Sequence, residues 1–409
     1  MKNQILWPAI ALAAVAASCK DDGPNFTTLQ PEQGAASLYT LPTGYTAENV
    51  DSATLAMTNV ASNITTTYRL GTAGTDIRVE DGLYNMTLTA WTHRTVAGKT
   101  VTETLRDGKQ NVNIGGGSFP LSFTLVRVGG GQGFVLAEIC TTAKPAEGQS
   151  SYPYSGYFRI YNNSADTLYA DGLCIFESAW TSVNKQAYTP DIMSEAVAVW
   201  AVYQIPGSGR DVKVAPGASL VIADQAIDHT QANPNAYDLS RANFEWYDET
   251  TRNLDIDNLD VPNLLKVYCS SATVWVPSIQ NNRSYGIGWL GGSRGAISNE
   301  QYISDYKYDY SYVTPLLNGG TREMNGSAYK IPNDWILDFV NTSPRTQHAW
   351  TLCAPSVDAG YVSLGETGKD ANSKGKAARR KFANGQMVDT NNSTEDMEVV
   401  DADPWHVFQ

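Results

Sequence analysis

The sequence predicts an all-β protein built from two β-sandwich domains, and three observations lead to this prediction. Charged residues make up only 17% of the 409 residues, against roughly 25% in typical soluble domains. The chain is instead rich in Gly (34) and Tyr (22), with long runs of Ser, Thr and Asn. Apolar and polar residues alternate at several places, which is the pattern of a half-buried strand. The length suits two or three domains that each bury a core.

Residues 1–18 form an apolar segment with a positive start. Lys2 supplies the charge, and the apolar run from Ile5 to Val15 is too short to span a bilayer. The small residues that follow lead directly to Cys19, and this arrangement resembles the lipobox of bacterial lipoproteins. The resemblance implies a signal peptide followed by Cys19 with an acylated thiol, so that acyl chains hold the protein to a membrane lipid surface.

The acidic pair Asp21-Asp22 comes directly after the predicted lipidation site. It is similar to the export tag of Bacteroidota lipoproteins that are moved to the outer face of the outer membrane. We therefore expect a lipid-anchored outer-membrane protein exposed at the cell surface, with the periplasmic face as the alternative. Residues 19–34 contain Pro24 and Pro31, and we interpret them as a polar tether.

Residues 35–128 are rich in Thr and carry strand periodicity. In residues 81–90, Tyr84, Met86, Leu88 and Ala90 fall on one face of the predicted strand. Asp-Gly pairs at 81–82 and 107–108 mark turns between strands. These features predict an N-terminal sandwich, and the run after the first turn resembles the closing strand of transthyretin-like and immunoglobulin-like modules.

A glycine cluster at residues 129–133 marks the boundary to a second domain, residues 134–409. Within it, residues 134–140, 157–164 and 167–176 are predicted strands. Phe158 and Ile160 alternate with Arg159 and Tyr161, which predicts a strand with one buried face and one exposed face.

The order of these strands resembles the lamin-tail domain, an immunoglobulin-like β-sandwich. Arg159 departs from that family, which usually has an acid nearby. Motifs such as Asn162-Asn163-Ser164 and Asp334 to Asp338 resemble an uncharacterised family of Bacteroidota surface lipoproteins found beside TonB-dependent receptors. This second resemblance implies an outer-membrane β-barrel transporter as partner and carries no catalytic residue.

Three long segments separate the predicted strands of the second domain: residues 184–196, 224–259 and 293–330. Loops of more than roughly 15 residues are uncommon in compact domains and are often functional. Because these segments are rich in Trp and Tyr, we expect them to decorate one end of the sandwich and to form the contact surface.

The sequence gives little support for a nucleotide site, a nucleic-acid surface, a transition-metal site or a catalytic triad. Residues 286–291 match G-x-G-x-x-G by letter, but the residues that follow do not open a helix, so a tightly packed strand is the better interpretation. The net charge of −13 disfavours a phosphate-binding surface, and the four His residues lack metal-ligand spacing. We therefore predict no nucleotide, no nucleic acid, no cofactor, no transition-metal site and no catalytic residue.

Two acidic runs, residues 255–260 and 389–396, offer oxygen ligands for a structural calcium ion. The competing interpretation is a pair of Asx-rich turns. A basic run at residues 374–381 precedes the second acidic run, and we interpret it as a solvated loop that pairs with this neighbour.

Four cysteines remain in the second domain: Cys140, Cys174, Cys269 and Cys353. An exported protein meets an oxidising route, which favours a disulfide. A small buried thiol is an equal alternative for the cysteines in apolar strands.

The function predicted from these features is a non-enzymatic surface lipoprotein that acts as an accessory subunit of a TonB-dependent outer-membrane transporter. The alternative is a carbohydrate-binding or adhesive surface module. A third hypothesis is a hydrolase in which acids such as Glu138 or Asp338 meet only in the folded protein.

Overall fold

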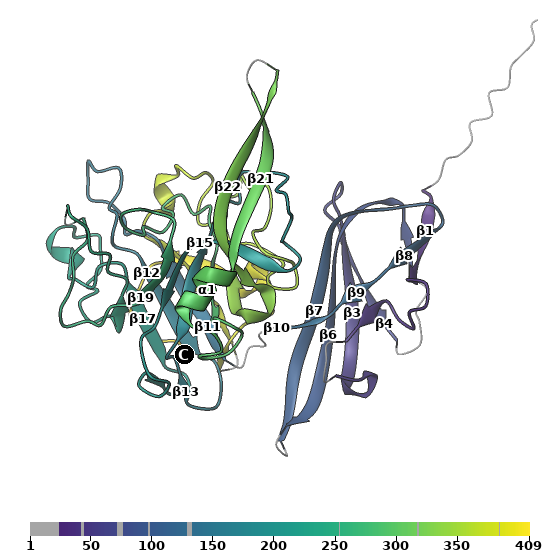
Figure 1. The fold of residues 1–409 in the computed structure, drawn as a ribbon, viewed down its shortest axis with the longest axis horizontal. Helices are drawn as coiled ribbons and strands as arrows, with labels where there is room; N and C mark the ends of the chain where they lie inside the picture. Colours follow the sequence, from purple (N-terminus) through teal and green to yellow (C-terminus); the bar gives the residue numbers. More distant parts are fainter. Residues whose placement is uncertain are drawn as a thin grey trace, which may run out of the picture.

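The structure, a computed structural model, describes residues 24–41, 45–71, 77–96, 99–128, 133–252, 254–316, 319–383 and 385–409. The predicted signal peptide and Cys19 lie outside these residues. Strands account for 42% of the structure and helices for 6%, which confirms the all-β prediction. Figure 1 shows two groups of sheets, one on each side of residues 129–132.

The first group of strands forms a five-stranded sheet of order β10-β7-β6-β3-β4, a three-stranded sheet of order β5-β1-β8 and the pair β2-β9. Its strands are β1 (Phe26–Pro31), β2 (Tyr39–Thr40), β3 (Val50–Asn59), β4 (Thr65–Leu70), β5 (Ile77–Glu80), β6 (Gly82–Val96), β7 (Lys99–Ile114), β8 (Ser118–Leu121), β9 (Phe123–Thr124) and β10 (Val126–Val128).

The core of this group lies between the two larger sheets. Tyr84, Met86, Leu88 and Ala90 of β6 are all buried in it, as their alternation predicts. The tether is shorter than the sequence suggests, because residues 26–31 form β1 and Leu29 is buried in the same core. The alternation of Leu29 with polar neighbours is too brief to distinguish from a polar linker.

The second group of strands forms a six-stranded sheet of order β18-β17-β12-β11-β24-β27 and a seven-stranded sheet of order β21-β22-β15-β14-β20-β23, with β19 paired to β15. Two short pairs, β13-β16 and β25-β26, complete it. Its strands are β11 (Phe134–Cys140), β12 (Tyr157–Asn162), β13 (Leu168–Tyr169), β14 (Leu173–Ser178), β15 (Ala196–Gln204), β16 (Lys213–Val214), β17 (Ser219–Ala223), β18 (Phe244–Glu245), β19 (Leu265–Cys269), β20 (Tyr285–Trp289), β21 (Lys307–Pro315), β22 (Thr321–Pro332), β23 (Ile336–Val340), β24 (Lys376–Arg380), β25 (Phe382–Ala383), β26 (Gln386–Met387) and β27 (Met397–Asp401).

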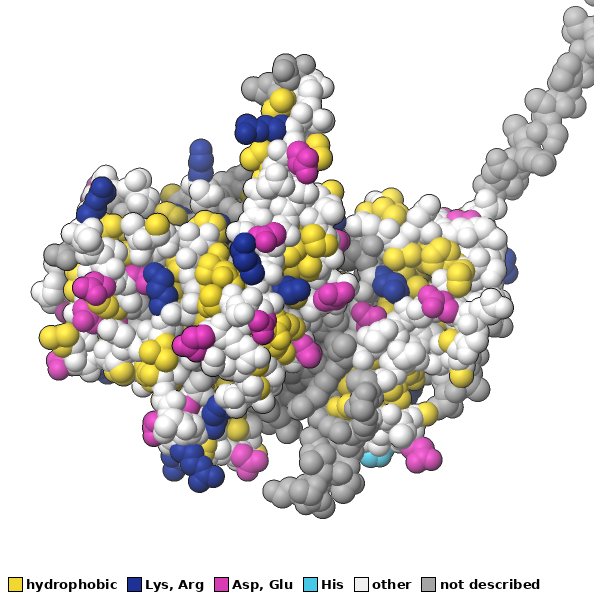
Figure 2. All heavy atoms as spheres, in the orientation of Figure 1, with side chains coloured by type: hydrophobic (Ala, Val, Ile, Leu, Met, Phe, Trp, Pro, Cys, Tyr) yellow, Lys and Arg dark blue, Asp and Glu magenta, His cyan; other side chains and the backbone are white. Residues whose placement is uncertain are grey.

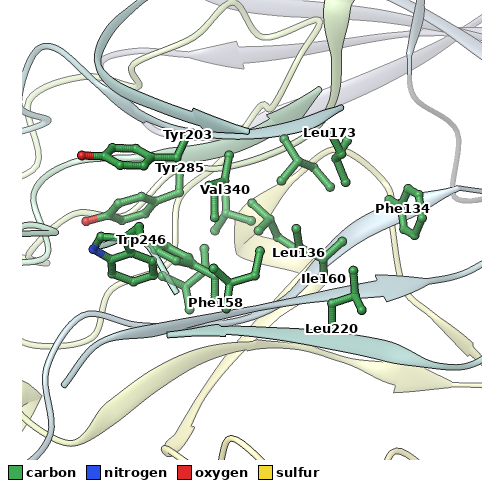
Figure 3. Close-up of a cluster of buried hydrophobic side chains, with 14 of the residues drawn as sticks. Phe134, Leu136, Phe158, Ile160, Leu173, Tyr203, Leu220, Trp246, Tyr285 and Val340 are labelled. Carbon is green, nitrogen blue, oxygen red and sulfur yellow. The ribbon is translucent and has the colours of Figure 1, made fainter. Parts of the chain in front are cut away.

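The main core fills the space between these two sheets (Figure 3). Phe158 of β12 stacks on Trp275 with ring centroids 5.9 Å apart, and it also contacts Trp246 and Tyr285. Aromatic rings packed in this way contribute both buried area and favourable ring geometry. The second group is therefore a β-sandwich with an aromatic core.

Strand β12 differs from its prediction, because all six of its residues are buried. The outer face of the six-stranded sheet is covered by apolar residues of the segment after β17, including Leu239, and by the C-terminal segment, including Trp405. A polar residue on that face, such as Arg159, is consequently enclosed rather than exposed to solvent. The alternation does place Phe158 and Ile160 in the main core, but the segments that cover the other face are distant in sequence.

Helices are short in this fold. The α-helices are α1 (Asn299–Asp305) and α2 (Ser393–Asp396), and single 3-10 turns occur at Ala47–Asn49, His229–Gln231, Asn333–Trp335 and Ala371–Ser373. Within the described ranges, none of the helices has the length and apolar character needed to cross a membrane.

The two groups of sheets meet at β7. The guanidinium of Arg106 is buried and donates to the backbone carbonyl oxygens of Thr390 and Asn391 in the second group. Nearby, an added Cβ at Gly108 would lie only 2.4 Å from the Cβ of Pro355. Hydrogen bonds to the loop before α2 and close packing against Pro355 therefore link the two groups.

Candidate functional site

The most prominent surface feature of the second group is the hairpin formed by β21 and β22, which projects from the body in Figure 1. Nearly all of it lies in the predicted insertion 293–330, and β22 extends two residues beyond it. The insertion therefore extends the seven-stranded sheet instead of forming an irregular loop. Figure 2 shows hydrophobic, basic and acidic side chains mixed on this hairpin.

One face of the hairpin carries a row of tyrosines, Tyr308, Tyr310 and Tyr312, at alternate positions of β21. The centroids of successive rings are 5.3 Å and 6.4 Å apart. Tyr310 lies across its register partner Gly326, where an added Cβ would come within 2.7 Å of the phenol ring. Glycine at this position therefore gives the ring the space it needs.

Rings from other segments continue this row, and we call the whole set the aromatic platform: Trp180, Tyr188, Tyr308, Tyr310, Tyr312 and Trp350. Tyr188 comes from the predicted insertion 184–196 and stacks on Trp180, with centroids 3.8 Å apart and planes within 5°. The outer rings, Tyr188, Tyr310 and Tyr312, are half-buried. They present aromatic surface to solvent at the base of the projecting hairpin.

The free edge of β21 is protected against pairing with another strand. Thr189 and Ser311 exchange two backbone hydrogen bonds of 2.8 and 2.9 Å, which occupies the centre of the edge. Lys307 and Asp309 form an exposed ion pair at one end, and Pro315 lacks an N–H at the other. Charges and proline at an edge are common devices against strand addition. Contacts are thus expected on the faces of the hairpin.

The predicted insertion 224–259 plays a mainly structural role. Ala226, Leu239 and Ala242 pack on the outer face of the six-stranded sheet, and Trp246 belongs to the main core. Its most exposed large apolar side chain among the described residues is Leu259, which has 90% of its surface accessible. Of the two longest predicted insertions, the hairpin is therefore the better candidate contact surface.

Glu138 lies in a buried row of charges across three strands of the six-stranded sheet. Its register partners are Arg159 on β12 and Arg379 on β24. Arg379 Nε is 2.7 Å from Glu138 Oε2, and Arg159 Nη1 is 3.9 Å from the same oxygen. Tyr157 donates its hydroxyl to the other carboxylate oxygen. We call Arg159, Glu138 and Arg379 the arginine row.

Asp338 on β23 is paired with Arg380, the residue that follows Arg379 on β24. Both of its carboxylate oxygens accept from Arg380 Nη2, at 2.7 and 2.6 Å. Arg380 Nη1 also lies 3.3 Å from Asp389 and 3.4 Å from Asp396. Successive residues on a strand point to opposite faces, so β24 carries Arg379 and Arg380 to different acids. Glu138 and Asp338 thus each have their own arginine instead of facing one another across a pocket.

The prediction of a solvated loop at residues 374–381 is therefore wrong. Residues 376–380 form β24, and both of its arginines are buried. The expected pairing with the acidic neighbour does occur, through Arg380 and the acids of residues 389–396. Sequence reasoning missed the burial because the only apolar residues of this strand are two alanines, Ala377 and Ala378.

The acidic runs have their oxygens engaged by the protein. Asp255 accepts the backbone N–H groups of Asp248 and Ile256, and Asp396 accepts those of Thr390 and Asn392. Asx turns are present as well, because Asn258 Oδ1 accepts the backbone N–H of Asp260 and Asn392 Oδ1 accepts that of Thr394, in each case two residues further along the chain. In the described part of the chain, no group of three or more His, Cys, Asp or Glu residues has the geometry to hold a metal ion.

The four cysteines are free thiols, and three of them, Cys140, Cys174 and Cys353, are buried. Burial raises the pKa of the Cys140 thiol to about 12, which keeps it protonated and unreactive. The alternative of small buried thiols therefore describes these three residues.

The glycine motif forms a tightly packed strand, as predicted. Gly286 and Gly288 lie in β20, where an added Cβ would be 2.5 Å from the Phe176 ring and 2.2 Å from the Trp335 carbonyl oxygen. The next helix, α1, starts only at Asn299. The glycines therefore allow close packing of β20. The strand is not followed directly by a helix whose N-terminus could bind a phosphate.

Comparison with known proteins places this architecture beside a family without an assigned activity. Residues 215–403 match DUF4876, described as a protein of unknown function. The crystal structure of a DUF4876 family protein from Bacteroides thetaiotaomicron VPI-5482 is similar, with a TM-score of 0.55 and 19% identity. The similarity covers 92% of this chain and 95% of the other, and it concerns the fold. No curated protein matches the chain.

Proposed function

We propose that the chain is a non-enzymatic lipoprotein of the outer membrane, exposed at the cell surface, which serves as a partner subunit of a TonB-dependent β-barrel transporter. The observation that carries this proposal is the projecting β21–β22 hairpin with its half-buried tyrosines. Tyrosine is enriched at protein interfaces, where its ring supplies contact area at a small entropy cost. The lamin-tail-like and lipoprotein resemblances support the sandwich as a scaffold that holds this hairpin.

Anchoring through Cys19 is the first part of the proposal. In Cys19→Ala, the acyl chains have no attachment point, and the protein is expected to move from the membrane to the soluble fraction after detergent partitioning. Mass spectrometry of the wild-type N-terminal peptide should show the added acyl chains. An acylated, membrane-bound Cys19→Ala protein would contradict this part of the proposal.

Contact through the hairpin is the second part. A photoreactive amino acid at Val313, a residue 57% exposed on β21, is expected to cross-link to an outer-membrane barrel protein in intact cells. The same probe at Leu259, which is more exposed but lies on the insertion 224–259, is expected to give little of this product. Equal cross-linking at both positions would show that the hairpin is not the contact.

The tyrosine row should determine how strongly the complex holds together. Replacement of Tyr310 and Tyr312 by Ala is expected to reduce barrel protein retained in mild-detergent purification at least tenfold, because interface tyrosines are often worth about 2 kcal/mol or more each. Tyr247→Ala removes a half-buried tyrosine elsewhere and should leave retention unchanged. Wild-type protein that purifies only as a monomer, under conditions that preserve related complexes, would overturn the proposed role.

A carbohydrate-binding module is the second candidate, and the aromatic platform is the observation that favours it. Sugar rings stack on aromatic faces, and Tyr188, Tyr310 and Tyr312 offer such half-buried faces side by side on one side of the hairpin. A glycan array with wild-type protein and Tyr188→Ala tests this candidate. Binding that disappears in the variant would favour the module over the transporter partner.

A further inference from the structure

The arginine row contains buried hydrogen-bond donors that the protein leaves without acceptors. Nε and Nη1 of Arg159 and Nη2 of Arg379 are buried, and none has a hydrogen-bond partner in the described part of the chain. The two residues themselves are only 4% and 8% exposed. Buried donors are nearly always paired, and orphaned groups on a charged side chain are particularly unfavourable.

The charges of the row do not balance either. Two guanidinium groups share the single carboxylate of Glu138, which also accepts from Tyr157 and from the backbone N–H of Asp403. The next residue along the row, Glu398 on β27, is exposed, and no ion pair joins it to Arg379 among the described residues. The exposed Asp403 also acts on Arg159, but the enclosed side chains of the row alone carry one excess positive charge, which is costly away from water.

The C-terminal segment covers this row. The Phe408 ring lies 4.5 Å from Arg159 Cζ, and the backbone of Asp403 bonds to Glu138. Apolar clusters flank the row, with Tyr157 and Val221 on one side and Val135 and Tyr161 on the other. The orphaned donors are consequently enclosed between apolar side chains, where a charged acceptor would bind strongly.

We propose that the arginine row binds a small oxyanion of the carboxylate, sulfate or phosphate type between Arg159 and Arg379, beneath the C-terminal segment. An oxyanion supplies both the missing acceptors and the missing negative charge. The planar guanidinium group suits it because its N–H donors match the spacing of two oxygens. This inference is independent of the proposed transporter partner, since the row lies in the six-stranded sheet and the hairpin belongs to the seven-stranded sheet.

Thermal unfolding of the full-length protein in detergent tests the proposal. The starting buffer contains the bulky anion HEPES. Inorganic phosphate, sulfate or acetate then replaces HEPES at constant ionic strength. At least one of the three is expected to raise the midpoint by about 2–4 °C with saturation, as binding to the folded state alone requires. Phosphate and sulfate also stabilise proteins generally. That effect rises without saturation and serves as the baseline.

Three variants separate site binding from this baseline. Arg159→Met should lose the saturable part, whereas Arg345→Met, which removes an exposed arginine paired with Glu366, should keep it. Glu138→Gln raises the excess charge of the row, so it should be less stable without added anion and respond to a lower anion concentration. A purely structural salt bridge would not produce this opposite pair of effects.

A measurement on the wild-type protein keeps the proposal testable when a variant does not fold. Crystals soaked in selenate, an analogue of sulfate with an anomalous signal, should show a peak between the two guanidinium groups. Midpoint shifts that are identical in the wild type and Arg159→Met would overturn the proposal. A soaked crystal that shows a water molecule and no selenate at the arginine row would also overturn the proposal.

Discussion

Replacement of Arg380 by Met is expected to lower the free energy of unfolding by about 3–5 kcal/mol, the usual cost of removing one partner from a buried ion pair. Arg380 is 2% exposed and lies among Asp338, Asp389 and Asp396, all of them buried acids. Its Nε also donates to the carbonyl oxygen of Leu136 at 3.0 Å. Methionine fills part of the space but leaves Asp338 without its paired guanidinium, while Asp389 and Asp396 keep the more distant Arg106.

Urea unfolding monitored by circular dichroism measures this loss. Lys376→Met is the matched control, because Lys376 lies on the same strand and pairs with Asp401, which is almost fully exposed. An exposed pair contributes about 0–1 kcal/mol. Replacing Asp338 by Leu in the Arg380→Met background should recover part of the loss, since one buried charge then disappears. Equal losses in the two single variants would show that the buried network contributes little.

The strand pattern of the first group could be predicted because burial there follows the local alternation. Tyr84, Met86 and Leu88 point into one core, as expected. Thr89 is the exception: it lies on the opposite face and is nevertheless buried, because Arg106 covers it and donates to its hydroxyl at 3.2 Å. Arg106 is engaged there by the loop before α2, so the burial depends on a contact between the two groups.

The arginines of β24 could not be placed from sequence for a related reason. Arg379 lies 241 residues from Glu138, and Arg380 lies 42 residues from Asp338. A run of basic residues resembles a solvated loop unless the acids that neutralise it are known. The place of the projecting hairpin was partly predictable, since residues 293–330 stand out as a long segment rich in Tyr, whereas their role as a contact surface stays a prediction. Its regular pairing was hidden by the many polar residues of a strand pair exposed to solvent.

Stability is expected to fall as the pH rises from about 6.5 to 8, because several buried acids bind protons more tightly in the folded chain. Burial raises the pKa of Glu245 to about 7, although it accepts two backbone N–H groups. Burial also raises the pKa of Asp358 to about 6, so the slope that this group causes lies mostly below pH 6.5. Asp224 is buried near Asp255, Asp248 and Glu245, and burial followed by these charges raises its pKa well above the usual range.

The sign follows from proton linkage. Above the ordinary pKa of a carboxyl, roughly 4, the folded state binds more protons than the unfolded state, so stability decreases until the pH passes the raised pKa. The buried histidines act oppositely, because burial lowers the pKa of both His229 and His348. Their contribution changes only below about pH 6.5, the ordinary pKa of His. Above that pH the carboxyl groups set the slope.

Unfolding midpoints measured between pH 6.5 and 8 at constant ionic strength test this expectation. Glu245→Gln removes one titrating proton and should flatten the decline by at most about 1 kcal/mol after allowance for screening. Asp224→Asn should stabilise the protein at pH 8, because a neutral amide replaces a carboxyl group whose Oδ2 is buried without a donor in the described structure. Asp166→Asn, at an exposed turn, should leave the pH profile unchanged. A wild-type midpoint that rises from pH 6.5 to 8 would mean that these acids are already ionised in the folded protein.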